Sequence, residues 1–280
     1  MLSPCTATLI ALIATAVTAS NIRAPTRTTS VDLFNGPNLH LKPISALDPV
    51  PGHLTNAQRL ARGLPLNPPV RRRKRHGQIA RRQNASPLPP ITGYISLTCD
   101  SPIAEPDGPV YISSNANAFG EYTPTTDLSE VLAISVPASS GSPTGMTALN
   151  GNLRVNFPNV VAILGFATTS GDMSPGSANY AYIGGSTSTP PGSPAVTQPN
   201  SYSAAAGVPR GVESAIWQRD ANNRLTIAWT NEDGSRPEVF FAYVPGANAF
   251  IITGDPAAFS ANFGTTIACE ATLVPQSAEP

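Results

Sequence analysis

The sequence predicts an all-β protein, an antiparallel β-sandwich of the lectin-like or jelly-roll-like kind. Leu225, Ile227 and Trp229 alternate with Thr226, Ala228 and Thr230, which is the period of a half-buried strand, and residues 239–244 are assigned the same period. Turn-forming residues separate the apolar runs, at residues 220–223, 232–235 and 245–248. We therefore expect four consecutive strands within residues 212–252, whose apolar face packs on a second sheet.

A secretory signal is expected at the start of the 280-residue chain. The apolar run over residues 9–17 is too short to span a bilayer, and Val17 and Ala19 are small enough for signal cleavage. The alternative is a buried N-terminal helix, for which the polar segment behind it offers no core. We expect a secreted protein without a membrane anchor, in five segments: signal peptide (1–19), disordered basic pro-segment (20–82), linker (83–90), β-sandwich domain (91–275) and tail (276–280).

Charge divides the chain at a basic cluster. Residues 20–82 contain twelve Lys or Arg against two Asp, a net charge of +10, while the rest contains five basic and fifteen acidic residues, a net charge of −10. The basic part is rich in Pro, Thr and Asn and poor in aromatics, so we expect disorder apart from a short helix near residues 54–63. This division favours a precursor over two domains of one working protein.

The basic run over residues 71–75 is interpreted as part of a processing site. In a secreted precursor we expect a kexin-like protease to cleave after Arg75 or after Arg82. The alternatives are a nuclear-import or nucleic-acid patch and a retained basic arm that docks on the acidic domain. Asn84 begins an Asn-x-Ser acceptor for an N-linked glycan in the exposed linker.

The β domain consists of expected strands joined by turns that contain Pro, Gly and Asn. Ahead of residue 212, strands are expected at residues 91–99, 109–113, 129–136, 153–157, 160–168 and 180–183. The stretch 184–211 is expected to be a long loop, functional or mobile. Asp255 and Pro256 begin a short helix that ends at Gly264, and residues 265–274 make the last strand.

Two cysteines remain after signal removal, Cys99 in the first expected strand and Cys269 in the last. Two cysteines in a secreted domain usually pair, so we expect a disulfide between them. Closing so long a loop stabilises the fold by about 5 kcal/mol at most. The alternatives are two buried thiols and a metal site, and two sulfurs without a histidine fall short of four ligands.

Several kinds of chemistry are excluded because the chain after Arg82 has neither His nor Lys. A Ser-His-Asp or Cys-His centre needs an imidazole, the usual zinc sites need His or more Cys, and Schiff-base chemistry needs Lys. We find no phosphate-binding loop and expect no cofactor. A surface near −10 also disfavours nucleic acid as a partner.

Carboxylates remain as candidate catalytic groups for an acid-active hydrolase, either a glycosidase or an acid protease. The candidates, none of them in an identifying motif, are Glu121, Asp127, Glu213, Glu232 and Asp233. Each is more often a solvated surface charge. A calcium site at Asp220 and Asn222 is less favoured than a hairpin turn, and Trp217 and Trp229 are interpreted as core rather than as a sugar-stacking platform.

Several stretches resemble a family of secreted proteins of mushroom-forming (basidiomycete) fungi. They include residues 54–65 with the following basic run, 119–122, 213–217, 231–237 and 254–256. The resemblance implies a secreted fungal precursor; the family has no established activity, so the resemblance assigns no catalytic residue.

The leading functional hypothesis is a secreted, non-enzymatic protein that is wall-associated or binds a polysaccharide such as a cell-wall glycan. The motivation is an acidic β domain rich in Ser, Thr and Asn, without His or Lys. The alternatives are the acid-active hydrolase and an effector-type protein that acts on another organism. The only other partner expected is the processing protease.

Overall fold

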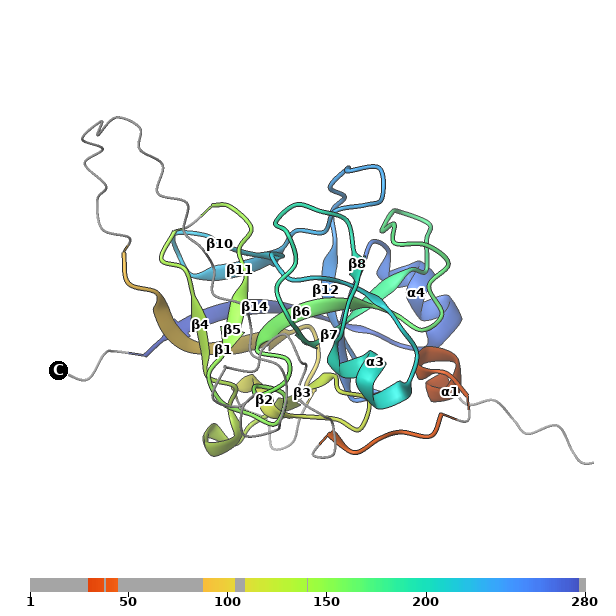
Figure 1. The fold of residues 1–280 in the computed structure, drawn as a ribbon, viewed down its shortest axis with the longest axis horizontal. Coiled ribbons are helices and arrows are strands. Elements are labelled where there is room, and N and C mark those ends of the chain that lie inside the picture. Colours follow the sequence, from red (N-terminus) through yellow and green to blue (C-terminus); the bar gives the residue numbers. More distant parts are fainter. Residues whose placement is uncertain (1–29, 38, 45–87, 104–108, 140, 277–280) are drawn as a thin grey trace, which may run out of the picture.

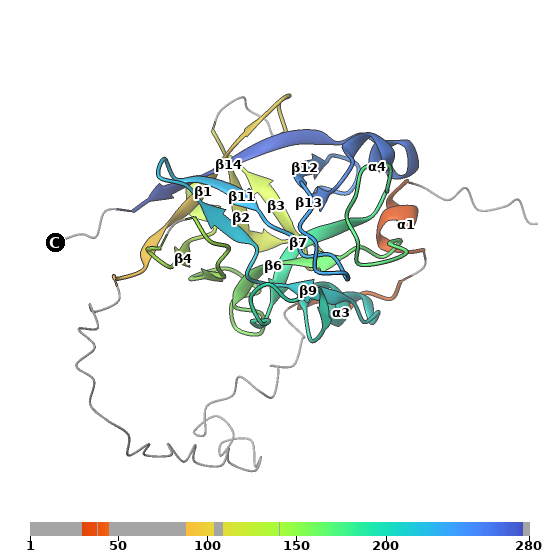
Figure 2. The same cartoon turned by 90° about the horizontal axis from the view of Figure 1, so that it is seen from above.

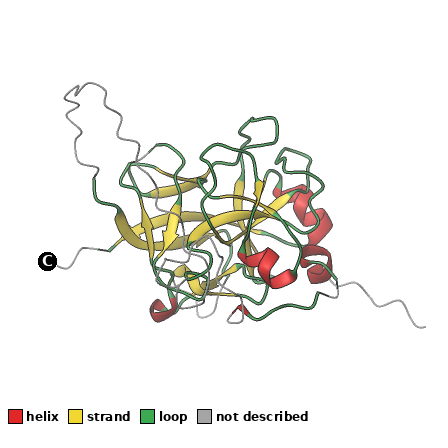
Figure 3. Ribbon diagram, in the orientation of Figure 1, coloured by secondary structure: helices red, strands yellow, loops and turns green. Residues whose placement is uncertain are grey.

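The computed structural model describes residues 30–37, 39–44, 88–103, 109–139 and 141–276 (Figure 1). The strands are β1 (Ile91–Cys99), β2 (Val110–Ala116), β3 (Tyr122–Thr125), β4 (Ile134–Val136), β5 (Met146–Ala148), β6 (Asn159–Leu164), β7 (Tyr180–Ser186), β8 (Val196–Thr197), β9 (Gly211–Glu213), β10 (Trp217–Arg219), β11 (Arg224–Ile227), β12 (Phe240–Val244), β13 (Ala249–Thr253) and β14 (Ile267–Pro275). The helices are α1 (Ser30–Asn35), the 3₁₀ helix η3 (Leu128–Glu130), α3 (Ser201–Ala206) and α4 (Pro256–Phe263). The expected all-β class is confirmed (Figure 3).

The strands pair antiparallel and close into a ring. The neighbours run β14-β12-β13-β7-β6-β5-β4-β1, and β1 pairs with β14 again. The pairing of β1 with β14 extends from Gly93 opposite Pro275 to Cys99 opposite Cys269. A closed ring leaves few strand edges exposed. It takes the place of the two separate sheets that a sandwich would have.

The expected disulfide is confirmed. Cys99 and Cys269 are bonded, with Cα atoms 4.0 Å apart, and they are register partners on β1 and β14. The bond therefore fastens the pair of strands that closes the ring.

The prediction that four consecutive strands within residues 212–252 lie side by side is wrong. β11 and β12 are not neighbours, because β14 lies between them and pairs with both. The tight turns at 220–223 and 245–248 do join paired strands, with Asn223 at φ 65° and Asn248 at φ 49°. The turn at 232–235 instead belongs to a longer connection, so β14, the last strand in sequence, completes this part of the sheet.

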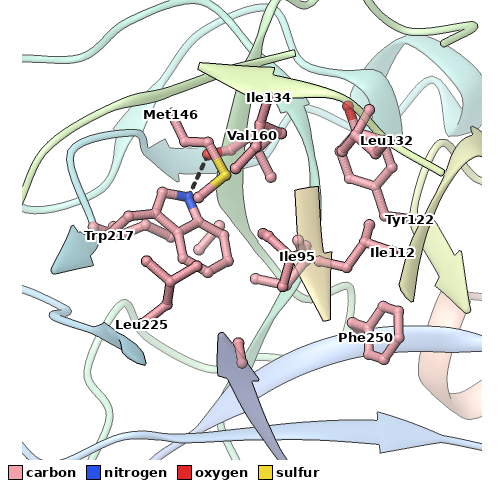
Figure 4. Close-up of a cluster of buried hydrophobic side chains, with 14 of the residues drawn as sticks. Ile95, Ile112, Tyr122, Leu132, Ile134, Met146, Val160, Trp217, Leu225 and Phe250 are labelled. Atoms are coloured by element: carbon pink, nitrogen blue, oxygen red, sulfur yellow. Dashed lines mark hydrogen bonds between the residues drawn. The ribbon is translucent and has the colours of Figure 1, made fainter. Parts of the chain in front are cut away.

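Large apolar side chains from many strands fill the interior of the ring (Figure 4). Trp217 is one of the two largest, and its Nε1–H donates to the carbonyl oxygen of Val160 at 2.8 Å. Trp229 is also buried, and its Nε1–H donates to the carbonyl oxygen of Gly171 at 2.8 Å. Each large side chain removed from water contributes about 1.5–3 kcal/mol. Both tryptophans thus belong to the core, as the sequence predicted.

A second apolar cluster lies on the outer face of β6, β7, β12 and β13. Val160 and Ala162 face the interior, so the alternating residues Val161 and Ile163 face outward. Helices α1, α3 and α4 cover this face, and Figures 1 and 2 both place α1 beside α4. This covered outer face is where the candidate site lies.

The prediction of α4 from its sequence is confirmed, whereas three other predicted ranges differ from the structure. Helix α4 has the predicted bounds because Asp255 accepts hydrogen bonds from the N–H groups of Ala257 and Ala258. The expected strand at 129–136 is shortened because Asp127 caps η3. The expected strand at 153–157 is a turn, in which Phe157 N–H donates to the carbonyl oxygen of Leu153. The stretch 184–211 was expected to be a loop but contains the end of β7, β8 and α3.

The expectation of disorder over residues 20–82 is wrong for residues 30–37 and 39–44, which we call the docked segment. Phe34 packs on the outer face of the ring, and Lys42 N–H donates to the carbonyl oxygen of Ala205 at 3.0 Å. Among the described residues, no ion pair joins this segment to the β domain. Apolar burial and main-chain hydrogen bonds order the segment instead.

Several expectations lie outside the described residues. They are the signal peptide at 1–19, the helix near 54–63, cleavage after Arg75 or Arg82, and glycosylation at Asn84. In the part of the chain that the structure covers, no helix has both the length and the apolar character to cross a membrane.

Candidate functional site

The candidate site is built around Phe34, which is only 1% exposed although it comes from a six-residue helix. Its ring stacks on Tyr180 with ring centroids 5.0 Å apart, and it meets Tyr182 edge-on at 5.1 Å and Phe259 at 6.0 Å. An isolated helix of this length is unstable in water. The aromatic contacts therefore hold α1 in place, and α1 brings its main chain to the tyrosines.

Three tyrosine hydroxyls bind consecutive carbonyl oxygens of the docked segment. Tyr180 and Tyr182 both donate to the carbonyl oxygen of Phe34, at 2.5 and 2.6 Å. Tyr202 of α3 donates to the carbonyl oxygen of Asn35 at 2.6 Å. Burial raises the pKa of all three phenols, so they stay neutral donors. The three hydroxyls therefore contact the docked segment through its main-chain acceptor atoms.

The loop after β6 completes the wall of the site. The N–H of Phe166 donates to the Tyr182 hydroxyl oxygen at 2.9 Å, so that hydroxyl is held from both sides. Arg210 donates to the carbonyl oxygen of Phe166, and its guanidinium lies 5.4 Å from the centroid of the Phe166 ring. Gly36 has φ +96°, and a Cβ there would lie 2.8 Å from the same ring. Glycine is thus required where the segment passes Phe166.

Glu121 lies at the same site with no exposed surface. Asn117 Nδ2–H donates to Glu121 Oε2 at 2.7 Å, while Asn117 Oδ1 accepts from the N–H of Glu121 at 3.1 Å. Burial raises the pKa of Glu121 to about 8, against the lowering effects of Asn117 and of the nearby Asn35 amide. Near neutral pH the carboxyl is therefore mostly protonated.

The Asn35 amide lies close enough to the Glu121 carboxyl to lower its pKa, but their contact is not a hydrogen bond of standard geometry. Within the described residues, Glu121 Oε1 and both amide atoms of Asn35 are buried and make no hydrogen bond of acceptable geometry. A buried polar atom without a partner costs about 1–3 kcal/mol. The docked segment therefore supplies hydrogen-bond acceptors to all three tyrosine hydroxyls but leaves Oε1 of Glu121 without a hydrogen bond of standard geometry.

Glu213 is also buried, but it is on the other face of the sheet. Glu121 bridges to Gly184, which is opposite Val161, whereas Glu213 is opposite Ala162. Register partners point to the same face and consecutive residues to opposite faces, so the two carboxyls are separated by the sheet.

Burial raises the pKa of Glu213 to about 8, although the Thr230 N–H and the charge of Arg236 lower it. It is held by Thr230 N–H at 3.2 Å from each oxygen. Its high pKa thus arises without any contribution from Glu121, and the two do not form the carboxylate pair that a glycosidase uses.

The other carboxylate candidates have local structural contacts. Asp127 caps η3, and Asp233 Oδ1 accepts from the N–H of Ser235 at 2.8 Å within its own turn. Glu232 Oε1 accepts from the N–H of Gly171 at 2.9 Å and ties two loops together. Asp220 Oδ1 accepts from the N–H groups of Asn222 and Arg224 at 2.8 Å, which is the hairpin turn rather than a cation site.

The structure brings one predicted candidate, Glu121, together with residues that sequence reasoning missed: Phe34, Tyr180, Tyr182, Tyr202 and Arg210. The only sequence signal for them is that Tyr180 and Tyr182 are two apart in a strand and so share a face. We call the group of Tyr180, Tyr182, Tyr202 and Glu121 the tyrosine site. It offers hydroxyl donors, a protonated carboxyl and an aromatic cage. Comparisons with protein-family models, curated proteins and solved structures found no match to this chain.

Proposed function

We propose that the protein is a secreted precursor whose β domain is a non-enzymatic binding protein, kept latent because the docked segment fills its ligand site. The observation that carries the proposal is the donation of three tyrosine hydroxyls to the carbonyl oxygens of Phe34 and Asn35. Residues 45–87 separate this segment from the domain and include Arg75 and Arg82. Cleavage after either arginine would turn the segment into a separate, exchangeable chain.

Removal of the segment would leave hydrogen-bonding groups in need of partners. Three buried hydroxyls would lose their acceptors, and the Glu121 carboxyl would become accessible beside them. Convergent polar groups in a largely apolar pocket are typical of a ligand site. A wall polysaccharide is one ligand to test, and both tryptophans are unavailable for it because they are buried and hydrogen-bonded in the core.

The test compares intact and cleaved protein. Mass spectrometry of the secreted protein should find a start at His76 or Gln83, and gel filtration of the cleaved form should separate the segment from the domain. The freed domain should then bind at least one of chitin, β-glucan, mannan or a peptide library, while an Arg75→Gln, Arg82→Gln control does not. A secreted chain that starts at Ser20 with intact arginines, or a segment that never separates, would overturn the proposal.

A second candidate is an acid-active hydrolase that uses one carboxyl. The observation in its favour is the Phe34 carbonyl oxygen, which receives two hydroxyl donors in the site that also holds a protonated Glu121. Donors that converge on a carbonyl oxygen also stabilise charge in acyl transfer. Activity of the freed domain that Glu121→Gln abolishes and Glu213→Gln preserves would establish this candidate over the first.

A further inference from the structure

We propose that the tyrosine site of the freed β domain binds polypeptide, and that it selects an aromatic residue followed two positions later by glycine. This rests on the proposed function and names its ligand class. The docked segment shows the pattern, with Phe34 in the cage, the carbonyl oxygens of Phe34 and Asn35 on the tyrosines, and Gly36 against Phe166.

The cage selects an aromatic side chain. Phe34 is enclosed by Tyr180, Tyr182 and Phe259, and such ring pairs are stabilised beyond the area that they bury. A sugar ring in the same space would place hydroxyl groups against aromatic carbon, where they would lack partners. The cage therefore favours a peptide over a glycan.

The hydroxyls select a main chain. Two donors meet one carbonyl oxygen and a third meets the next one along the chain, so their arrangement matches the repeat of a peptide backbone. None of these bonds uses a side-chain atom of the segment. The residue at the position of Asn35 can therefore be of any type as far as these bonds are concerned. Its side chain meets only the constraint of the nearby Glu121.

Glycine at the third position follows from two independent constraints. Gly36 has φ +96°, a region that residues with a Cβ rarely adopt, and an added Cβ would lie 2.8–3.0 Å from three atoms of the Phe166 ring. Arg210 restrains this ring by stacking over it. Displacing the ring to make room for a Cβ would therefore disturb its contact with Arg210.

Leu33 provides a matched control within the same helix. Leu33 is 48% exposed, whereas Phe34, one residue later, is 1% exposed. Both are large and apolar, so truncating each to alanine changes the apolar character of the peptide to a similar degree. Only one of the two changes removes a contact with the cage.

The experiment uses the full chain cleaved after Arg82 and a fluorescent synthetic peptide of residues 30–44, with binding read by anisotropy. Peptide Phe34→Ala should bind about 100-fold more weakly, Gly36→Ala about tenfold more weakly or worse, and Leu33→Ala within about twofold of the parent. In the protein, Tyr182→Phe should weaken binding while the circular dichroism spectrum is unchanged. The control Tyr94→Phe should leave binding unaltered, because Tyr94 is on β1, where its ring meets Tyr111 edge-on.

The outcomes separate this inference from the proposed function. If the cleaved segment is gone and the freed domain is folded but does not bind the peptide, this inference alone is overturned. Equal effects of Leu33→Ala and Phe34→Ala would also overturn it, because the cage would then select nothing. So would displacement of the bound peptide by chitin, β-glucan or mannan, which would assign the site to a glycan and leave the latency proposal standing.

Discussion

The hydroxyl groups of Tyr180 and Tyr182 lie 3.4 Å apart and donate to one acceptor, the carbonyl oxygen of Phe34. The two residues are on one face of β7, two positions apart, and point at a main chain that is more than 140 residues distant in sequence. Since burial keeps both phenols neutral, the pair acts as a fixed double donor. The strength of docking should therefore depend on how many of these hydroxyls remain.

Removal of the two hydroxyls should weaken docking more than additively. Tyr180→Phe or Tyr182→Phe alone leaves one donor on the Phe34 carbonyl oxygen and should cost about 1 kcal/mol, whereas the double substitution leaves that oxygen without either donor. Hydrogen exchange of the amides of residues 33–36 in the intact chain measures the effect. Additive effects, or equal effects from the control Tyr94→Phe, would contradict the shared-acceptor arrangement.

Gly36→Ala should release the docked segment without unfolding the β domain. The added methyl group meets Phe166 and the backbone is held at φ +96°, which together should cost about 1–3 kcal/mol. Gly234→Ala is the control, because Gly234 also has a positive φ of +82° but open space around it. Limited proteolysis should cut near residues 30–37 faster in the first variant than in the second.

Docking should weaken as pH rises. The pKa of Glu121 is about 8 under the segment and its ordinary value is 4.5, so burial under the segment favours the protonated carboxyl. If release exposes Glu121 to water, docking is strongest below pH 4.5 and is lost progressively as pH rises to 8, with dissociation increasing by up to about tenfold per pH unit. Dissociation of the cleaved segment, followed by gel filtration across this range, measures the change.

The groups that face Glu121 limit what else can produce this pH dependence. They are the neutral amides of Asn117 and Asn35, the tyrosines of the site, and the charge of Arg210, which acts on Tyr180 and Tyr202. Burial raises the pKa of these tyrosines above the range concerned. Glu121→Gln should accordingly flatten the profile.

Glu213→Gln is the matched control for the pH dependence. Its carboxyl is also buried and its pKa is also raised to about 8, but it lies on the opposite face of β6 and β7. The substitution should change how stability of the whole domain varies between pH 4.5 and 8 and leave segment dissociation as it was. Equal effects of the two substitutions on dissociation would mean that the segment responds to global stability alone.

Reduction of the disulfide should destabilise the domain without moving the tyrosine site. Cys99 and Cys269 close a loop with a sequence separation of 170, for which loop-closure entropy gives at most about 5 kcal/mol. Replacing both cysteines by serine should lower the urea midpoint, while the docked segment stays protected at low urea. An unchanged midpoint would show that the register of β1 and β14 alone fixes the closure.

The sequence predicts those helices and strands whose ends are set by neighbouring residues, such as caps and turns. It does not predict those whose position depends on pairing with strands far along the chain. Helix α4 and strand β1 have their predicted bounds because capping residues and strict alternation define them. Helix α3 also had signals, since Asn200 accepts from the N–H of Ser203 and Gly207 adopts φ 73° after the last turn, but the surrounding Ser, Thr and Pro suggested a loop.

The insertion of β14 between β11 and β12 has no local signal at all. Both of those strands look like hairpin partners in sequence, and only the pairing of Arg224 with Thr272 and of Ala242 with Ala268 separates them. The docked segment was missed for a related reason. One phenylalanine in a polar stretch has no periodicity, and its cage is assembled from β7 and α4, which are far along the chain.

The closing pair of β1 and β14 sets the earliest moment at which the ring can exist during synthesis. β14 is the last strand of the ring to be synthesised. Until it emerges from the ribosome, β1 and β12 each lack a neighbour, and the ring is open between them. Phe259, one wall of the aromatic cage, is also made late. The segment around Phe34 therefore spends nearly the whole of translation with nothing to dock on, and reaches its site only after the β domain has been made.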